Sequence, residues 1–403
     1  TYKFSSRSEL DTAIDKWISD KNDAIKSYGE INTWDVSLIT DFSNLFSEKI
    51  SFNSDISSWD VSSGVNFSSM FFGAISFNQD ISTWDVSNGN DFSSMFNSAS
   101  SFNKPLGSWD VSSGENFGGM FYIAPSFNQD LSKWDVSNGN NFSYMFFGCK
   151  SFNQDISSWD VSNGNNFKSM FNSASLFNQP LGSWDVSSGI NFAEMFYVAD
   201  SFNQDLSKWD VSNGNNFSYM FFGCKSFNQD ISSWDVSSGR DFSNLFNAAS
   251  SFNQDISNWD VSYGIDFHEM FWEARNFNQD LSFWNVSLGV DFTYMFNGAV
   301  LMNKNGWLST PSSDVFFGQT ITGDASAEKI IGTVGNDTLS GLSGKDTIYG
   351  GDGWDKLKGG PGDDTLFGGE KNDTAIYTGK KNDYLITENE GILIVQDLRN
   401  DSA

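Results

Sequence analysis

Histidine, cysteine and proline are scarce in this 403-residue chain, which contains one histidine, two cysteines and five prolines. The single histidine, His268, stands beside Glu269. With no second histidine and no nearby cysteine, neither a Ser-His-Asp constellation nor a histidine–cysteine metal site can be assembled around it. We therefore expect His268 to be a solvated side chain with no catalytic or metal-binding role.

Basic residues are also few, since 23 lysines and arginines face 51 aspartates and glutamates, for a formal net charge of −28. Nucleic-acid binding needs a basic surface, and an anionic membrane would repel the chain, so neither is expected as a partner. No apolar run approaches the ~18 residues of a transmembrane helix. No signal peptide is recognisable and the first residue is not methionine, so we expect a processed or cropped product.

Aromatic residues, in contrast, are abundant and recur with a fixed period of 25. Valine follows each repeated tryptophan by two residues, and a Leu-Phe or Met-Phe pair follows it by eleven and twelve. One unit of this length cannot bury its own apolar side, so eleven copies without an insertion predict a solenoid of stacked units. The repeated tryptophans are Trp34, Trp59, Trp84, Trp109, Trp134, Trp159, Trp184, Trp209, Trp234, Trp259 and Trp284.

Each repeat is predicted to contain one short strand and one helical return segment. The phrase Ile56-x-x-Trp59-x-Val61 has the L-x-x-L-x-L spacing of a leucine-rich repeat, which predicts a parallel strand with Trp59 and Val61 facing inward. Gly64 marks the turn after that strand. The segment 66–71 then has phenylalanine and methionine at helical or 3₁₀ spacing. The predicted fold class is therefore a leucine-rich-repeat-like solenoid of parallel β and 3₁₀-helix units.

An aspartate follows each repeated tryptophan up to Trp259, and Asn285 follows the last. These aspartates form a column of like charges about 5 Å apart on the outer face of the predicted strands. Two explanations stay open. Each carboxylate accepts hydrogen bonds from flanking serines and backbone N–H groups, or the column binds Ca²⁺ or a cationic partner. The candidate ligand-binding members are Asp110, Asp135, Asp160, Asp185 and Asp210.

A second column alternates aromatic residues and asparagine with a period of three repeats. The identical segments 126–162 and 201–237 show the same period, which indicates duplicated three-repeat blocks. The rings either lie flat over the edge of the core or form an evenly spaced stripe that stacks on sugars or on another copy of the chain. The candidate residues are Tyr122, Phe147, Tyr197, Phe222 and Trp272.

The two cysteines, Cys149 and Cys224, occupy the same position in repeats that are three units apart. At about 4.8 Å per stacked unit, they are expected to lie about 14 Å from each other. A disulfide needs Cα atoms within about 7 Å, so we expect two unpaired core residues that leave the redox compartment undetermined.

The sequence divides into five segments. Residues 1–30 contain a capping-box signal, Ser6-x-x-Glu9, followed by apolar residues at helical spacing, which predicts an N-terminal helical cap. Residues 31–302 are the predicted solenoid. The repeat is lost over residues 303–322, which we interpret as a linker or C-terminal closure. Residues 323–376 are predicted to form a parallel β-roll, and residues 377–403 a C-terminal β segment.

A nine-residue repeat of the form G-G-x-G-x-D-x-U-x, where U is apolar, fills residues 332–367. Glycines allow tight turns that direct carbonyl oxygens inward, and aspartate supplies charge, so the pattern predicts a calcium-binding parallel β-roll. Its apolar core is thin, and we expect it to fold only with the ion. Glu328 replaces the aspartate in a degenerate first turn, and Lys371 replaces a glycine in the last.

Two resemblances follow from these motifs. The phrase S-F-N-Q-D-I-S-x-W-D-V-S, with M-F eleven residues after its tryptophan, resembles the BspA-like leucine-rich-repeat surface proteins over about residues 1–302. The nonapeptides resemble the RTX, or hemolysin-type, calcium-binding repeats, which implies type I secretion. It also implies Ca²⁺ between alternate turns, pairing Asp337 with Asp355, Asp346 with Asp364 and Asp355 with Asp373. The implied ligands are Asp337, Asp346, Asp355, Asp364, Asp373, Gly335, Gly344, Gly353, Gly350, Gly359 and Gly368.

These features together predict a secreted or cell-surface, non-enzymatic protein. The solenoid, stabilised by calcium in the β-roll, would serve adhesion or recognition, with a surface glycan or protein as its partner. The alternative is a self-assembling subunit of an extracellular filament or surface layer. An enzyme such as a glycoside hydrolase is not favoured, because the array repeats its positions and no carboxyl with a recognisably raised pKa stands out.

Overall fold

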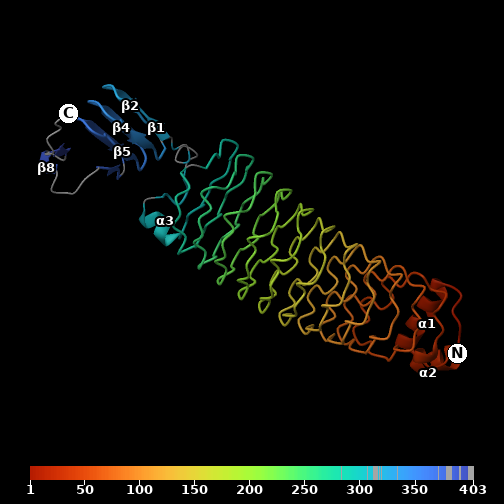
Figure 1. Cartoon of the computed structure of the whole chain (residues 1–403). Coiled ribbons are helices and arrows are strands. Elements are labelled where there is room, and N and C mark those ends of the chain that lie inside the picture. Colours follow the sequence, from red (N-terminus) through yellow and green to blue (C-terminus); the bar gives the residue numbers. More distant parts are fainter. Residues whose placement is uncertain are drawn as a thin grey trace. The chain divides into compact units, whose positions relative to one another are not determined.

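The computed structural model describes residues 1–282, 284–305, 307–311, 316, 318, 320–333, 335–370, 372–377, 384–389 and 392–397. The chain divides into two compact units, Thr1–Gln279 with Leu288–Pro311, and Asp280–Ser287 with Ser312–Ala403. We call them the array unit and the roll unit and describe each by itself (Figure 1). Within the described residues, no helix has the length and apolar character needed to cross a membrane.

The N-terminal end of the array unit is helical, as the sequence predicts. Helix α1 starts after Ser6, whose hydroxyl accepts a hydrogen bond from the backbone N–H of Glu9. The apolar side of α1 is buried, and the ring of Trp17 lies 5.8 Å from that of Trp34, the first tryptophan of the array. The helices therefore cover the apolar start of the repeats. The elements are α1 (Arg7–Ser19), α2 (Lys21–Tyr28) and the 3₁₀ helix η1 (Ile31–Thr33).

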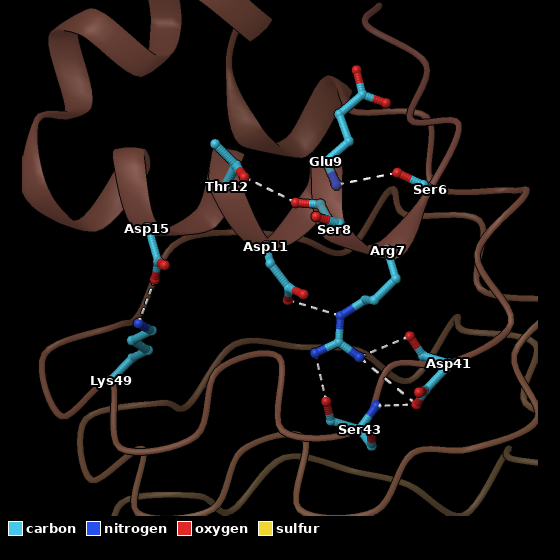
Figure 2. Close-up of polar contacts among 10 residues, drawn as sticks. All are labelled: Ser6, Arg7, Ser8, Glu9, Asp11, Thr12, Asp15, Asp41, Ser43 and Lys49. Carbon is cyan, nitrogen blue, oxygen red and sulfur yellow. Dashed lines mark hydrogen bonds and ion pairs between the residues drawn. The ribbon is translucent and has the colours of Figure 1, made fainter.

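Arg7 joins α1 to the first repeat (Figure 2). Its guanidinium group donates hydrogen bonds to the carbonyl oxygen of Asp41, at 3.0 Å, and to that of Ser43, at 2.6 Å. A second contact joins the Lys49 ammonium group to Asp15 at 2.6 Å. Both carbonyls lie on the first edge of the array, where no preceding repeat donates to them. Arg7 therefore supplies the hydrogen-bond donors that a further repeat would supply.

The repeats share one continuous aromatic core. Every repeated tryptophan from Trp34 to Trp284 is buried, together with its valine and with the Leu-Phe or Met-Phe pair that follows. Equivalent rings stack along the array, with the Phe67 and Phe92 centroids 5.6 Å apart and the Trp134 and Trp159 centroids 6.2 Å apart. The predicted solenoid and its buried face are therefore confirmed.

The backbone ladder between repeats lies on a different segment from the one predicted. Residues 57–58 form a turn and the rest of residues 56–61 have no regular structure, whereas the ladder of backbone hydrogen bonds runs along residues 66–73. There the N–H of Phe67 donates to the carbonyl of Asp91 at 2.8 Å, and every second residue repeats this bond to the next repeat. Ser69 has a φ of 55°, in the left-handed region. Ser69 still donates its N–H to the next repeat, but residues in this conformation break the extended backbone, so no continuous strand forms in this segment.

Side chains connect the repeats where the strand was predicted. The indole N–H of Trp84 donates to the carbonyl of Ile56, in the preceding repeat, at 3.1 Å, and the equivalent bond recurs along the array. The backbone N–H of Asn78 donates to Oδ1 of Asn53 at 2.9 Å. The L-x-x-L-x-L spacing correctly predicts which residues are buried, but burial does not determine which backbone groups pair.

Gly64 and its equivalents are required by packing. A Cβ atom at Gly64 would collide with the ring of Phe67 and with the carbonyl oxygen of Val61, and the same holds at each equivalent glycine up to Gly264. The chain turns here directly against its own core, and the turn leaves no room for a side chain.

The last repeat is closed by the residues that follow helix α3 (Val300–Lys304). The N–H of Phe296 donates to the carbonyl of Ser309 at 3.0 Å, and the N–H of Tyr294 donates to Oγ1 of Thr310 at 2.9 Å. These are the donors that reach the next repeat elsewhere in the array. The segment 307–311 therefore takes the place of a further repeat.

In the part of the roll unit that the structure describes, there are two parallel sheets, with strand orders β1-β3-β5-β7 and β2-β4-β6, and one antiparallel pair, β8-β9. Alternate turns of the nonapeptide repeat thus fall on the same sheet, around a core formed by Ile330, Leu339, Ile348 and Leu357. The strands are β1 (Thr320–Thr322), β2 (Lys329–Ile331), β3 (Thr338–Ser340), β4 (Thr347–Asp352), β5 (Lys356–Lys358), β6 (Thr365–Glu370), β7 (Thr374–Ala375), β8 (Tyr384–Asn389) and β9 (Ile392–Asp397).

Replacing a core tryptophan tests this architecture. Trp159 is 3% exposed and stacks on Trp134 and Trp184, so Trp159→Ala leaves a cavity in mid-array. We expect it to lower the free energy of unfolding by about 3–5 kcal/mol, measured by chemical denaturation of the full chain. Trp272→Ala is the control, because that ring is only half-buried and should cost much less. Similar losses for the two variants would show that the two rings contribute equally and would contradict the assigned core.

Candidate calcium-binding site

Each nonapeptide places its aspartate directly before a strand, so the aspartates of alternate turns lie next to one another. The N–H of Asp337 donates to Oδ1 of Asp355 at 2.8 Å, and the N–H of Asp346 donates to Oδ1 of Asp364 at 2.9 Å. Asp355 makes the same bond to Asp373 at 2.9 Å. The structure therefore brings together the three pairs that the RTX resemblance implies.

Carbonyl oxygens of glycines in these turns lie close to glycines of alternate turns. A Cβ atom at Gly350 would collide with Oδ2 of Asp355 and with the carbonyl oxygen of Gly368, so only glycine permits this approach. Gly353 has a φ of 123°, a conformation that favours glycine. The predicted ligands whose carbonyl oxygens lie against a glycine of an alternate turn are Gly335, Gly344, Gly350, Gly359 and Gly368.

Three aspartates of the nonapeptide turns, Asp337, Asp346 and Asp355, are buried. Asp346 is 0% exposed, and within the described residues its Oδ2 atom has no hydrogen-bond partner. Burial raises the pKa of Asp364, and the nearby charges of Asp346 and Asp363 raise it further. A hard divalent cation would relieve this repulsion and supply the missing partner. Ca²⁺, which takes about six to eight oxygen ligands, fits the carboxylates and carbonyls present.

Glu328 makes the contacts of the aspartate that it replaces. Its N–H donates to Oδ1 of Asp346 at 3.0 Å, as the other turns do. Its Oε2 accepts a hydrogen bond from the N–H of Asp324 at 2.9 Å, as Asp337 accepts one from Thr333. The predicted ligand set omits Glu328, although the nine-residue register placed it correctly. Lys371, which replaces a glycine in the last turn, lies outside the described residues.

The candidate aspartates of the array do not converge. All five are exposed, and each accepts a hydrogen bond from the backbone N–H of the serine two residues later, as Asp135 does from Ser137 at 3.0 Å. Bonds from the serine hydroxyl and N–H lower the pKa of Asp135 and of Asp185. This arrangement favours the first explanation, in which local hydrogen bonds stabilise each carboxylate.

His268 is not the solvated side chain expected from the sequence. Its ring is half-buried, with Nδ1 2.8 Å from Oδ1 of Asp266 and Nε2 3.0 Å from Nδ2 of Asn244. Together with Asp291, these residues form a cluster that could hold a metal ion. Across the described residues, Asp266, His268 and Asp291 are the one group of three histidine, cysteine or acidic side chains whose ligand atoms all lie within 4.8 Å of one another. The cluster could not be predicted from the sequence, because Asp266 and Asp291 are 25 residues apart and come together only where neighbouring repeats of the array pair.

Four of the candidate aromatic residues form two stacked pairs, which lie three repeats apart. The rings of Tyr122 and Phe147 are 4.5 Å apart, and those of Tyr197 and Phe222 are also 4.5 Å apart. Trp272 lies 5.9 Å from a tyrosine ring of the next repeat. All five rings are half-buried, so part of each is covered by the protein itself.

Removing calcium tests the role of the roll-unit aspartates. Without the ion, the buried carboxylates around Asp346 repel one another and the small core cannot compensate, so a chelator should unfold the roll unit. Circular dichroism of the full chain should show loss of the parallel strands, while the tryptophan fluorescence of the array unit serves as the internal control. Strand signal that survives chelation would contradict a calcium-dependent fold.

Acid should weaken the array unit. Hydrogen bonds from a serine hydroxyl and backbone N–H lower the pKa of Asp80, Asp135 and Asp260 below the ordinary value of 3.8. Such groups contribute stability that is present above the unfolded pKa and is lost as pH falls through the folded pKa. We expect the array to keep its stability down to about pH 4 and to lose it below that value, as followed by tryptophan fluorescence in denaturant. A gain in stability below this range would contradict the assigned bonds.

Comparison with protein families agrees with both units. The RTX calcium-binding nonapeptide repeat matches residues 322–357, 331–366, 343–375 and 358–386, and these repeats bind Ca²⁺, which confirms the predicted cofactor. No curated protein matches the chain. A family described as Mycoplasma protein of unknown function, DUF285, matches residues 12–134, 114–209 and 191–309. The chain therefore belongs to the DUF285 family, and it carries RTX calcium-binding repeats after its array.

Proposed function

We propose that this chain is a secreted or cell-surface, non-enzymatic recognition protein, in which the array unit presents the binding surface and the roll unit folds with calcium. The observation that carries the proposal is the buried carboxylate ladder around Asp346. Calcium sites of extracellular modules have dissociation constants of about 10⁻⁴–10⁻³ M, which suits the calcium level outside cells. A ladder of such sites therefore fits a protein that folds after export.

The chemistry of the array unit supports binding rather than catalysis. A general acid needs a carboxyl whose pKa is raised. Asp364, which has a raised pKa, lies in the roll unit, whereas the array carboxyls that shift, such as Asp135, shift downward. The array instead repeats its surface side chains at a fixed spacing, which suits an extended or repetitive partner.

The sequence motifs support export. The repeat phrase resembles the BspA-like surface proteins, and the RTX resemblance implies type I secretion. A surface glycan or protein is therefore the partner that we propose for the array unit, with calcium ions as the partners of the roll unit.

The proposal predicts that the full chain binds an external surface and does not polymerise. With calcium present, we expect separate particles by negative-stain imaging and binding to a glycan array or to an array of extracellular-matrix proteins. Chelation should unfold the roll unit and leave binding by the array unit in place. Ordered polymers that bind neither array would overturn the proposal and identify a self-assembling subunit.

A further inference from the structure

A hollow of about 480 Å³ lies on the array beside the first aromatic pair, and ten residues line it. Its walls include the rings of Tyr122 and Tyr144, whose centroids are 6.1 Å apart at an interplanar angle of 64°. Phe147 stacks on Tyr122 at 4.5 Å and holds that ring in place. The hollow is therefore bounded by aromatic side chains whose positions are fixed by packing.

The polar groups of the hollow are neutral. Asn116 and Asn141 lie side by side, with Nδ2 of Asn141 donating to Oδ1 of Asn116 at 2.9 Å. None of the ten lining residues is charged, in a chain whose formal net charge is −28. Hydroxyl, amide and aromatic groups without charge form the kind of surface that binds a sugar ring. The rings pack on its C–H faces, and the polar groups bond its hydroxyls.

Gly118 and Gly119 create the space. The equivalent residues in the duplicated block are Ala193 and Glu194, although the adjacent aromatic residues are the same in both blocks. Gly119 has a φ of 62° and Glu194 a φ of 59°, so the backbone is alike at the two sites. What differs is the side chain, which is absent at the first site and present at the second.

Glu194 shows how the missing side chain would fill the hollow. Its Oε2 accepts hydrogen bonds from Oγ of Ser169 at 3.0 Å and from Nδ2 of Asn172 at 3.2 Å. The equivalents of these two donors are Ser94 and Asn97, and both line the hollow. Oδ1 of Asn97 accepts a bond from Ser98, so its Nδ2 group is the end left to donate to a ligand.

We propose that this hollow is a binding subsite for one neutral hexose of a glycan. The inference rests on the proposed recognition function and assigns its ligand class. Ser94 and Asn97 bond the sugar hydroxyls, and Tyr122 and Tyr144 pack against the ring. An acidic sugar fits less well, because Lys168, which lies 3.7 Å from Glu194 in the second block, is replaced by Ser93 in the first.

The test exchanges the two sites in the full chain with calcium present. Gly118→Ala together with Gly119→Glu gives the first site the residues that the second already tolerates, so the array should remain folded, as a thermal melt will check. Saturation-transfer NMR would use methyl glycosides of glucose, galactose, mannose and N-acetylglucosamine, with methyl glucuronide as the acidic comparison. We expect transfer from the wild type to at least one neutral glycoside, and loss of that transfer in the double variant.

The reciprocal variant is the matched control. Ala193→Gly together with Glu194→Gly removes the carboxylate from the second site and should increase the transfer by opening a second hollow. Transfer that persists in the first variant, preference for the glucuronide, or no transfer from the wild type would each overturn the hexose subsite. The proposed function fails separately, if the wild type binds neither the glycan array nor the protein array.

Discussion

The array depends on hydrogen bonds that no repeat can complete by itself. The N–H of Phe67 is satisfied by the carbonyl of Asp91, and the N–H of Phe92 by the carbonyl of Asn116, each in the following repeat. The stacked rings have the same dependence, because each is covered by its equivalents on both sides. Stability is therefore a property of neighbouring pairs, and surface side chains can change without altering either interaction.

The two units differ in how the negative charge of their aspartates is stabilised. In the array, Asp135 stays exposed and is held by Ser137, so it needs no cation. In the roll unit, Asp346 is buried and its charge lies near that of Asp364, so we expect a bound cation to offset the repulsion. We therefore expect one chain to combine an array surface that needs no cation with a unit that folds only where calcium is available.

The sequence predicted burial and register well, because both follow from spacing. The 25-residue period places Trp159 in the core, and the nine-residue period places Asp337 beside Asp355, as the structure shows. The position of the backbone ladder could not be predicted. Its left-handed residues, such as Ser69 and Glu194, are not glycine and carry no local signal for that conformation.

The sites that the sequence missed depend on contacts between repeats. His268 meets Asp291 only across the ladder, and the hollow beside Tyr122 exists because Gly119 lacks the side chain that Glu194 has one block later. A motif search compares residues with a pattern and passes over such differences. Glu328 is a similar case, since it departs from the aspartate motif while keeping the contacts of an aspartate.

The closed edges of the array bear on how its length can change during evolution. Arg7 occupies the carbonyls of the first repeat, and Ser309 receives the N–H of Phe296 in the last, so a repeat added at either end would displace one of these contacts. A block inserted in the middle displaces nothing, because its two ends offer the donors and acceptors that its neighbours already use. The identical segments 126–162 and 201–237 lie inside the array, as this constraint requires. The array can lengthen from within by tandem duplication while the same two ends continue to close it.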